Sequence, residues 1–178
     1  MNSDYRRSFE IDKLEAATRQ LKEAIHMFFE CRDPVAVHTL AYAGHQILHD
    51  LCKSRNLKKE LASSLRDYEY VPDDMRDKYR NLLTSTANFI KHANRDANAK
   101  LLFDPKITEG FLFDATFLYQ HLQNDLFYEG AVFRMWFFLK FHEAFPEGEF
   151  KNKFKLMKTE LIDPDDFEFV LSVLNLKK

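Results

Sequence analysis

Glycine and proline, which favour turns, and cysteine, which can form disulfides, are scarce in this sequence. Its 178 residues include only 4 glycines, 5 prolines and 2 cysteines. So few glycines and prolines argue against many tight turns and favour long helices. The two cysteines, Cys31 and Cys52, are too few for a disulfide framework and are typical of a reducing compartment. We therefore expect a cytoplasmic protein.

The sequence also lacks a long apolar run and an excess of charge of one sign. Its most apolar stretch, GAVFRMWFFLKFHEAF, is too short to span a bilayer and contains Arg134, Lys140 and Glu143. The N-terminal residues do not form the apolar run of a signal peptide. The formal net charge is −2, so any RNA contact would need a local basic patch. No membrane partner is expected.

What the sequence does contain is apolar residues at intervals of three and four, the pattern of amphipathic helices. Such a helix is predicted over residues 9–31, and Asp33 and Pro34 are a good cap and first residue for a second one. Further helices are predicted near residues 57–64, 73–95, from Asp104-Pro105 to Leu122, over the aromatic stretch after Asn124, and over 149–160 and 165–176. The helix over 73–95 is expected to bury Met75, Tyr79, Leu82, Leu83, Thr86, Ile90 and Ala93.

No segment alternates between apolar and polar residues at a period of two, so no sheet is predicted. The sequence therefore predicts an all-α fold, an antiparallel helical bundle over residues 1–123. Residues 124–178 are predicted to form a helical extension that packs on the bundle, so that the two parts make one compact domain. Aromatic residues lie on nearly every side of the helix after Asn124, so it must be covered all round. A homodimer contact through this aromatic part is one interpretation.

One polar stripe stands out, in the segment TANFIKHANRD. At 100° per residue, Asn88 and His92 share a stripe with Asn81 and Ser85 that flanks the apolar face and is expected to be half-buried between helices. A histidine there can have its tautomer and pKa set for acid–base chemistry. Lys91 and Arg95 are neighbours on the adjacent side and are candidates to bind a phosphate. The alternative is a structural histidine beside a solvated Lys and Arg.

A second polar stripe lies on the helix that follows Pro34. It places His38, Tyr42 and His45 on one face. If this helix packs against the helix over 73–95, the two stripes face each other across one groove. His45 and His49 also have the spacing of two helical zinc ligands, but no further metal-binding motif accompanies them. We expect no metal and no cofactor.

On the layout IDKLEAA…DPVAVHTLAYAGHQILHDL…NFIKHANRD, residues 9–122 resemble a bacterial branch of the HEPN superfamily (higher eukaryote and prokaryote nucleotide-binding). The resemblance implies a four- or five-helix bundle, often dimeric, that binds a nucleotide or RNA. Many members are metal-independent ribonucleases of toxin or phage-defence systems. Their signature is an Arg, a polar residue and, after a few spacers, a His; Asn88 and His92 match the last two, whereas Ala87 stands in place of the Arg.

The resemblance implies roles for the candidate residues. His92 would serve as general acid or base, and Asn88 would orient it or the phosphate. Lys91 or Arg95 would neutralise phosphate charge. The groove would be lined further by His38, Tyr42 and His45. Because Ala87 replaces the Arg, a second interpretation stays open, a non-enzymatic helical module for interaction or dimerisation.

Overall fold

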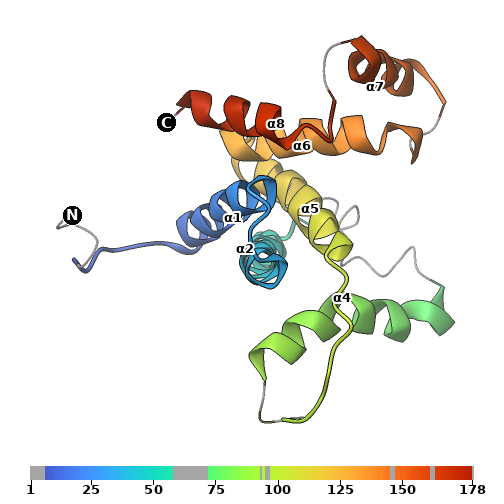
Figure 1. The fold of residues 1–178 in the computed structure, drawn as a ribbon. Helices are drawn as coiled ribbons and strands as arrows, with labels where there is room; N and C mark the ends of the chain where they lie inside the picture. Colours follow the sequence, from blue (N-terminus) through green and yellow to red (C-terminus); the bar gives the residue numbers. More distant parts are fainter. Residues whose placement is uncertain are drawn as a thin grey trace.

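The computed structural model describes residues 7–57, 72–92, 94, 97–144, 147–160 and 163–177. Within these ranges all regular secondary structure is helical (Figure 1), which confirms the predicted all-α class. The short helix predicted over 57–64 lies, beyond Leu57, outside the described residues.

The first two helices begin at side-chain caps that the sequence supplies. Helix α1 (Lys13–Phe29) starts after Asp12, whose carboxylate accepts a hydrogen bond from the backbone N–H of Glu15. Helix α2 (Pro34–Ser54) starts after Asp33, whose carboxylate accepts from the N–H groups of residues 35 and 36. Each cap satisfies N–H groups that have no partner within the helix. The predicted helix start at Pro34 is confirmed.

Helices α1 and α2 approach each other closely at Gly44. A Cβ atom on Gly44 would lie 2.7 Å from Cγ of Leu21 and 3.1 Å from the carbonyl oxygen of Ala17, both on α1. Only a residue without a side chain allows this spacing. The contact belongs to the main core, because Leu21, Ala17 and the neighbouring Leu48 are all buried.

Helix α4 (Arg76–Lys91) follows a short 3₁₀ turn, η2 (Asp73–Met75), and lies at one end of the molecule (Figure 1). It buries Leu83, Thr86 and Ala87, but Met75 is 45 % and Leu82 60 % exposed. The prediction that both are buried was therefore wrong. Helix α4 contacts the rest of the described chain through few residues, and its Leu83 and Ala87 form a small cluster with Tyr42 of α2 and Phe111, so only a narrow strip of α4 is covered. Ala93 lies outside the described residues.

Helix α5 (Lys106–Gln123) starts where the Asp104-Pro105 pair predicted, and the carboxylate of Asp104 accepts from the N–H of Lys106. Beyond it lie α6 (Tyr128–Lys140), the turn η3 (His142–Ala144), α7 (Glu149–Glu160), α8 (Phe167–Leu174) and the turn η4 (Asn175–Lys177). In Figure 1, α6 and α8 lie side by side on the opposite side of α1 and α5 from α4.

Two of the C-terminal helices, α6 and α8, share one hydrophobic core with α1, α2 and α5. The rings of Phe28 and Phe29 on α1 contact the indole of Trp136 on α6 edge-on, with centroids 5.1 and 5.5 Å away. Val170 and Leu174 of α8 belong to the same cluster of buried residues. Helices α6 and α8 thus cover apolar surface of α1, α2 and α5. The extension packed on a bundle stays a prediction. The division at residue 123 and the antiparallel arrangement stay predictions.

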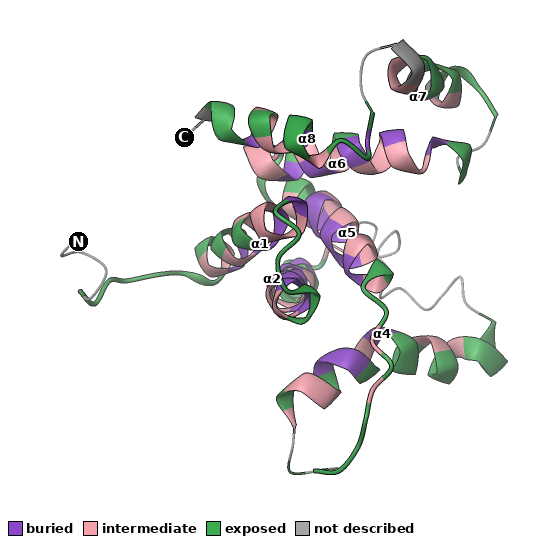
Figure 2. Ribbon diagram, viewed as in Figure 1, coloured by how far each residue is buried: buried purple, intermediate pink, exposed green. Residues whose placement is uncertain are grey.

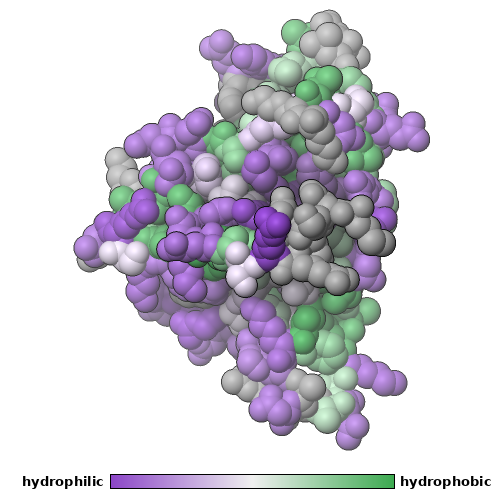
Figure 3. Space-filling view, turned by 90° about the vertical axis from the view of Figure 1, so that its left-hand side faces the viewer, coloured by the Kyte–Doolittle hydropathy of each residue, from purple (hydrophilic) through white to green (hydrophobic). Residues whose placement is uncertain are grey.

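Buried residues concentrate where α1, α2, α5 and α6 meet (Figure 2). Exposed residues are frequent on α4 and on the sides of α7 and α8 that face away from this core. Hydrophilic residues cover most of the face in Figure 3, with smaller hydrophobic areas between them. None of the helices in the described part of the chain combines the length and apolarity needed to cross a membrane.

Candidate functional site

His38 and His45 of α2 point into the interior, toward α5. Nδ1 of His38 lies 3.0 Å from Oγ1 of Thr108, and Nε2 of His45 lies 2.5 Å from Oδ2 of Asp114. Neither imidazole has any exposed surface. The second ring nitrogen of each, Nε2 of His38 and Nδ1 of His45, is buried without a hydrogen-bond partner. Both groups therefore help to join α2 to α5, and neither is reached by solvent.

Aromatic rings surround these histidines. The ring of Phe111 lies edge-on to His38, Tyr42 and His45, with centroid distances of 5.8, 5.1 and 5.0 Å. Burial, and to a smaller extent the charge of Lys91, lower the pKa of His38 from 6.5 to about 4. At neutral pH His38 is thus an uncharged hydrogen-bonding group.

The seam between α2 and α4 brings together three of the predicted site residues. Nζ of Lys91 lies 4.8 Å from the centroid of the Tyr42 ring, the geometry of a cation–π contact. A small depression beside this contact is too narrow for a water molecule. It is lined by His38, Thr39, Tyr42, Ala87, Ile90 and Lys91.

The polar stripe on α4 is more exposed to solvent than predicted. Asn81, Ser85 and Asn88 are exposed, so the prediction of a half-buried stripe was wrong for them. The helix buries Leu83 and Thr86, as predicted, and Ala87 with them. His92 is half-buried at the C-cap of α4, where its backbone N–H donates to the backbone carbonyl oxygen of Asn88. Arg95 lies outside the described residues.

The structure thus unites His38, Tyr42 and Lys91 at the seam. His45 does not line the depression there and is paired with Asp114. Across the described ranges, no group of three or more His, Cys, Asp or Glu side chains is placed to hold a metal ion. Of the two histidines with zinc-like spacing, His45 has one ring nitrogen on Asp114, and its ring stacks on His49 at a centroid distance of 6.4 Å.

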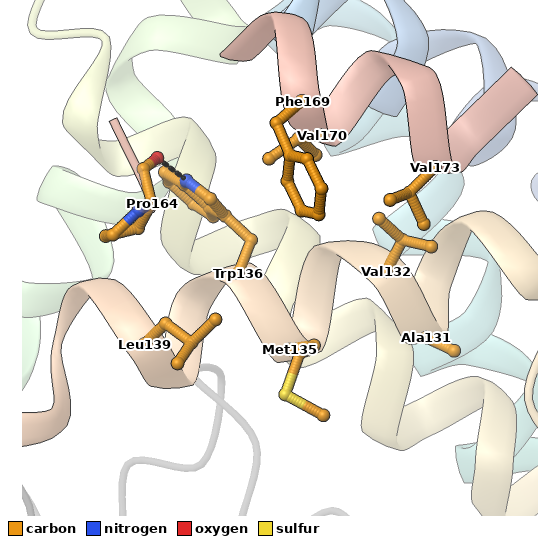
Figure 4. A pocket seen from close by; sticks show the side chains of 9 residues that line it. All are labelled: Ala131, Val132, Met135, Trp136, Leu139, Pro164, Phe169, Val170 and Val173. Carbon is orange, nitrogen blue, oxygen red and sulfur yellow. Dashed lines mark hydrogen bonds between the residues drawn. The ribbon is translucent and has the colours of Figure 1, made fainter. Parts of the chain in front are cut away.

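A second site, which the sequence did not predict, lies between α6 and α8 (Figure 4). It is a partly open cavity of about 260 Å³. At one end the indole N–H of Trp136 donates to the carbonyl oxygen of Pro164 over 2.8 Å, so these two polar groups satisfy each other. The cavity is lined by Ala131, Val132, Met135, Trp136, Leu139, Pro164, Phe169, Val170 and Val173.

A signal for this cavity was present in the aromatic stretch, where Ala131, Met135 and Leu139 recur every four residues. The spacing marks one face of a helix, but only the position of α8 makes that face into a cavity.

The described chain is therefore an all-helical protein with two distinctive sites, the α2–α4 seam and the α6–α8 cavity. Comparison of the chain with protein-family models, with curated proteins and with solved structures found no match.

Proposed function

We propose that this chain is a non-enzymatic binding protein whose α6–α8 cavity receives an apolar group of a partner. The observation that carries the proposal is the lining of the cavity. All nine residues are apolar in character, and the indole N–H among them already has an acceptor within the chain. A polar group of a ligand buried there would lose its hydrogen bonds to water without replacement. The cavity also presents no nucleophile, acid or base for chemistry.

The size of the cavity suits a small apolar group. A volume of about 260 Å³ exceeds that of a dry engineered cavity of roughly 150 Å³ that binds benzene. It lies just below the range of about 300–1,000 Å³ for ligand pockets. One or two large side chains, or a short alkyl chain, would fit. Each methylene group removed from water contributes about 0.8 kcal/mol.

Trp136 offers a direct test, because it is the single tryptophan of the chain and lines the cavity. Titration with 1-octanol, a neutral alkyl probe, is expected to shift its fluorescence emission in a saturable manner. The variant Ala131→Phe, which places a ring at the cavity, should abolish the shift. Ala99→Phe, at an exposed position between α4 and α5, is the matched control and should bind as the parent does. An unsaturable response that is equal in both variants would contradict the proposal.

A second candidate function is favoured by the contact between Lys91 and Tyr42. In this proposal the chain is an HEPN-like bundle that binds a nucleotide or RNA at the α2–α4 seam, as a stress or phage-defence protein. Lys91 and Asn88 are exposed at the end of α4, close in sequence to the half-buried His92, so a phosphate has access to a cation and an amide. If the protein cleaves RNA, His92 is the acid or base.

Two observations place this second candidate behind the first. Ala87, which stands where the superfamily has its Arg, is buried against α2 and supplies no charge for a phosphorane. His38 and His45 are enclosed, so a substrate would meet neither imidazole in this conformation. In this second candidate function, Arg95 is a further phosphate ligand.

A further inference from the structure

We infer that the apolar group in the α6–α8 cavity is carried by a basic amphipathic helix of another protein. This inference rests on the proposed function and adds the class of partner. It depends on three features of the described residues: the length of the cavity, the apolar rim around it and the charge at one end.

The residues that line the cavity extend along α6. Figure 4 shows Ala131, Met135 and Leu139 in a row along this helix, with residues of α8 facing them from the other side. Eight residues of helix span about 12 Å. A partner helix with apolar residues at positions i, i+4 and i+7 spans about 10 Å, so its anchors match the length of the groove.

Apolar side chains extend the cavity onto the surface. Met135 and Phe169, which line it, are 41 % and 42 % exposed. A small ligand held inside the cavity would leave this rim in water. A helix laid over the groove covers the rim as well as the cavity, which favours a helical segment over a small molecule.

The end of the groove at Pro164 is acidic. Asp163, Asp165 and Asp166 flank this proline, and Glu168 precedes Phe169. Lys140 hydrogen-bonds Asp165 and, with a smaller effect of Lys158, lowers the pKa of its carboxyl. Four carboxylates against two lysines leave an excess of negative charge, and Asp163, Asp166 and Glu168 form no ion pair with another described residue. A partner with Lys or Arg at this end is complementary.

The same charge argues against a second copy of this chain as the occupant. A two-fold dimer places the same patch of both copies against itself. The acidic ends would then lie in one interface without an excess of basic groups to oppose them, and like charges in contact weaken association.

The test uses the full chain and three tryptophan-free synthetic peptides of equal length. The first has Leu at i, i+4, i+7 and i+11 with Lys on its flanks, the second has Glu in place of Lys, and the third is the basic peptide scrambled so that its Leu residues share no face. Trp136 emission reports binding at the cavity. We expect the basic peptide to bind about tenfold more tightly than the acidic one at low salt, with the ratio falling as salt is added. The scrambled peptide should not bind.

Two variants localise the effect. Glu168→Lys should weaken binding of the basic peptide and reduce its advantage over the acidic one to about threefold or less. Glu23→Lys, the same exchange at an exposed position of α1, is the matched control and should leave both affinities unchanged. Ala131→Phe should abolish binding of the basic peptide.

The outcomes separate the inference from the proposed function. Saturable binding of 1-octanol with equal affinity for the basic and acidic peptides, or with no peptide binding, overturns the inference and leaves the proposed function in place. Failure of 1-octanol to bind overturns both. Light scattering that shows a dimer of the parent and a monomer of Ala131→Phe would assign the cavity to a second copy and would also overturn the inference.

Discussion

Nε2 of His45 on α2 lies 2.5 Å from Oδ2 of Asp114 on α5, and the two residues are 69 positions apart in the sequence. The imidazole is fully buried and the carboxylate nearly so. The pair joins α2 to α5, and these two helices meet in the interior of the protein. We therefore expect that loss of the pair lowers the free energy of unfolding.

Replacing Asp114 by Ala leaves His45 buried without this partner. We expect the free energy of unfolding to fall by about 3 kcal/mol, because a lone buried polar group keeps its desolvation penalty. Urea denaturation at neutral pH measures the loss. Asp74→Ala, at an exposed position of η2, should change stability by less than about 0.5 kcal/mol. Equal stability of the two variants would show that the buried pair adds nothing.

The pKa of His38 predicts a pH dependence of stability. Its folded pKa is about 4 and its unfolded value 6.5, so the unfolded chain binds the proton more tightly. The stabilising effect of the neutral form is complete above pH 6.5 and is lost as the pH falls toward 4. The loss amounts to at most about 3 kcal/mol, from about 1.4 kcal/mol per pKa unit.

Denaturation curves between pH 7 and 4 measure this loss, with His38→Gln as the comparison. The Gln side chain retains a polar contact for Thr108 but does not titrate, so its stability should depend less steeply on pH. Lys91→Gln removes the lesser cause of the shift and should reduce the loss slightly. Parallel curves for the parent and His38→Gln would assign the pH dependence to other groups.

Gly44→Ala tests the close approach of α1 and α2. Alanine favours a helix over glycine by about 1 kcal/mol, but the added Cβ would lie 2.7 Å from Leu21 and 3.1 Å from the backbone oxygen of Ala17. Overpacking costs about 1–3 kcal/mol, so we expect a net loss of stability of roughly 1 kcal/mol. Thermal unfolding followed by circular dichroism detects it. A higher melting temperature would mean that the two helices separate without cost.

The ribonuclease version of the second candidate function predicts cleavage of single-stranded RNA in the presence of EDTA. His92→Ala should then reduce the rate by about 100-fold or more, as expected for loss of a general acid or base. Lys91→Ala should weaken RNA binding, whereas Lys78→Ala, an exposed lysine near the start of α4, should not. RNA that remains intact with the parent protein, under conditions where the chain is folded, would remove the ribonuclease version.

Helix starts could be predicted from the sequence because they depend on residues that are close together in the chain. Asp33 binds N–H groups two and three residues ahead, and Asp104 binds that of Lys106. Such contacts form within one turn, so local chemistry determines them. The all-α class followed in the same way, from spacing within each segment.

The arrangement of the candidate sites depended on contacts between distant segments. The apolar pattern of α4 allowed several rotations about its axis, and packing on α2 buried Ala87 and left Asn88 exposed. The pairing of His45 with Asp114 could not be predicted from the sequence, because Asp114 lies on another helix. The α6–α8 cavity likewise exists only because Phe169, Val170 and Val173 of α8 lie opposite residues of α6. By itself the sequence determined the helices and most of their limits; the tertiary structure decided which of their side chains meet, because packing partners far apart in the chain are not encoded in local spacing.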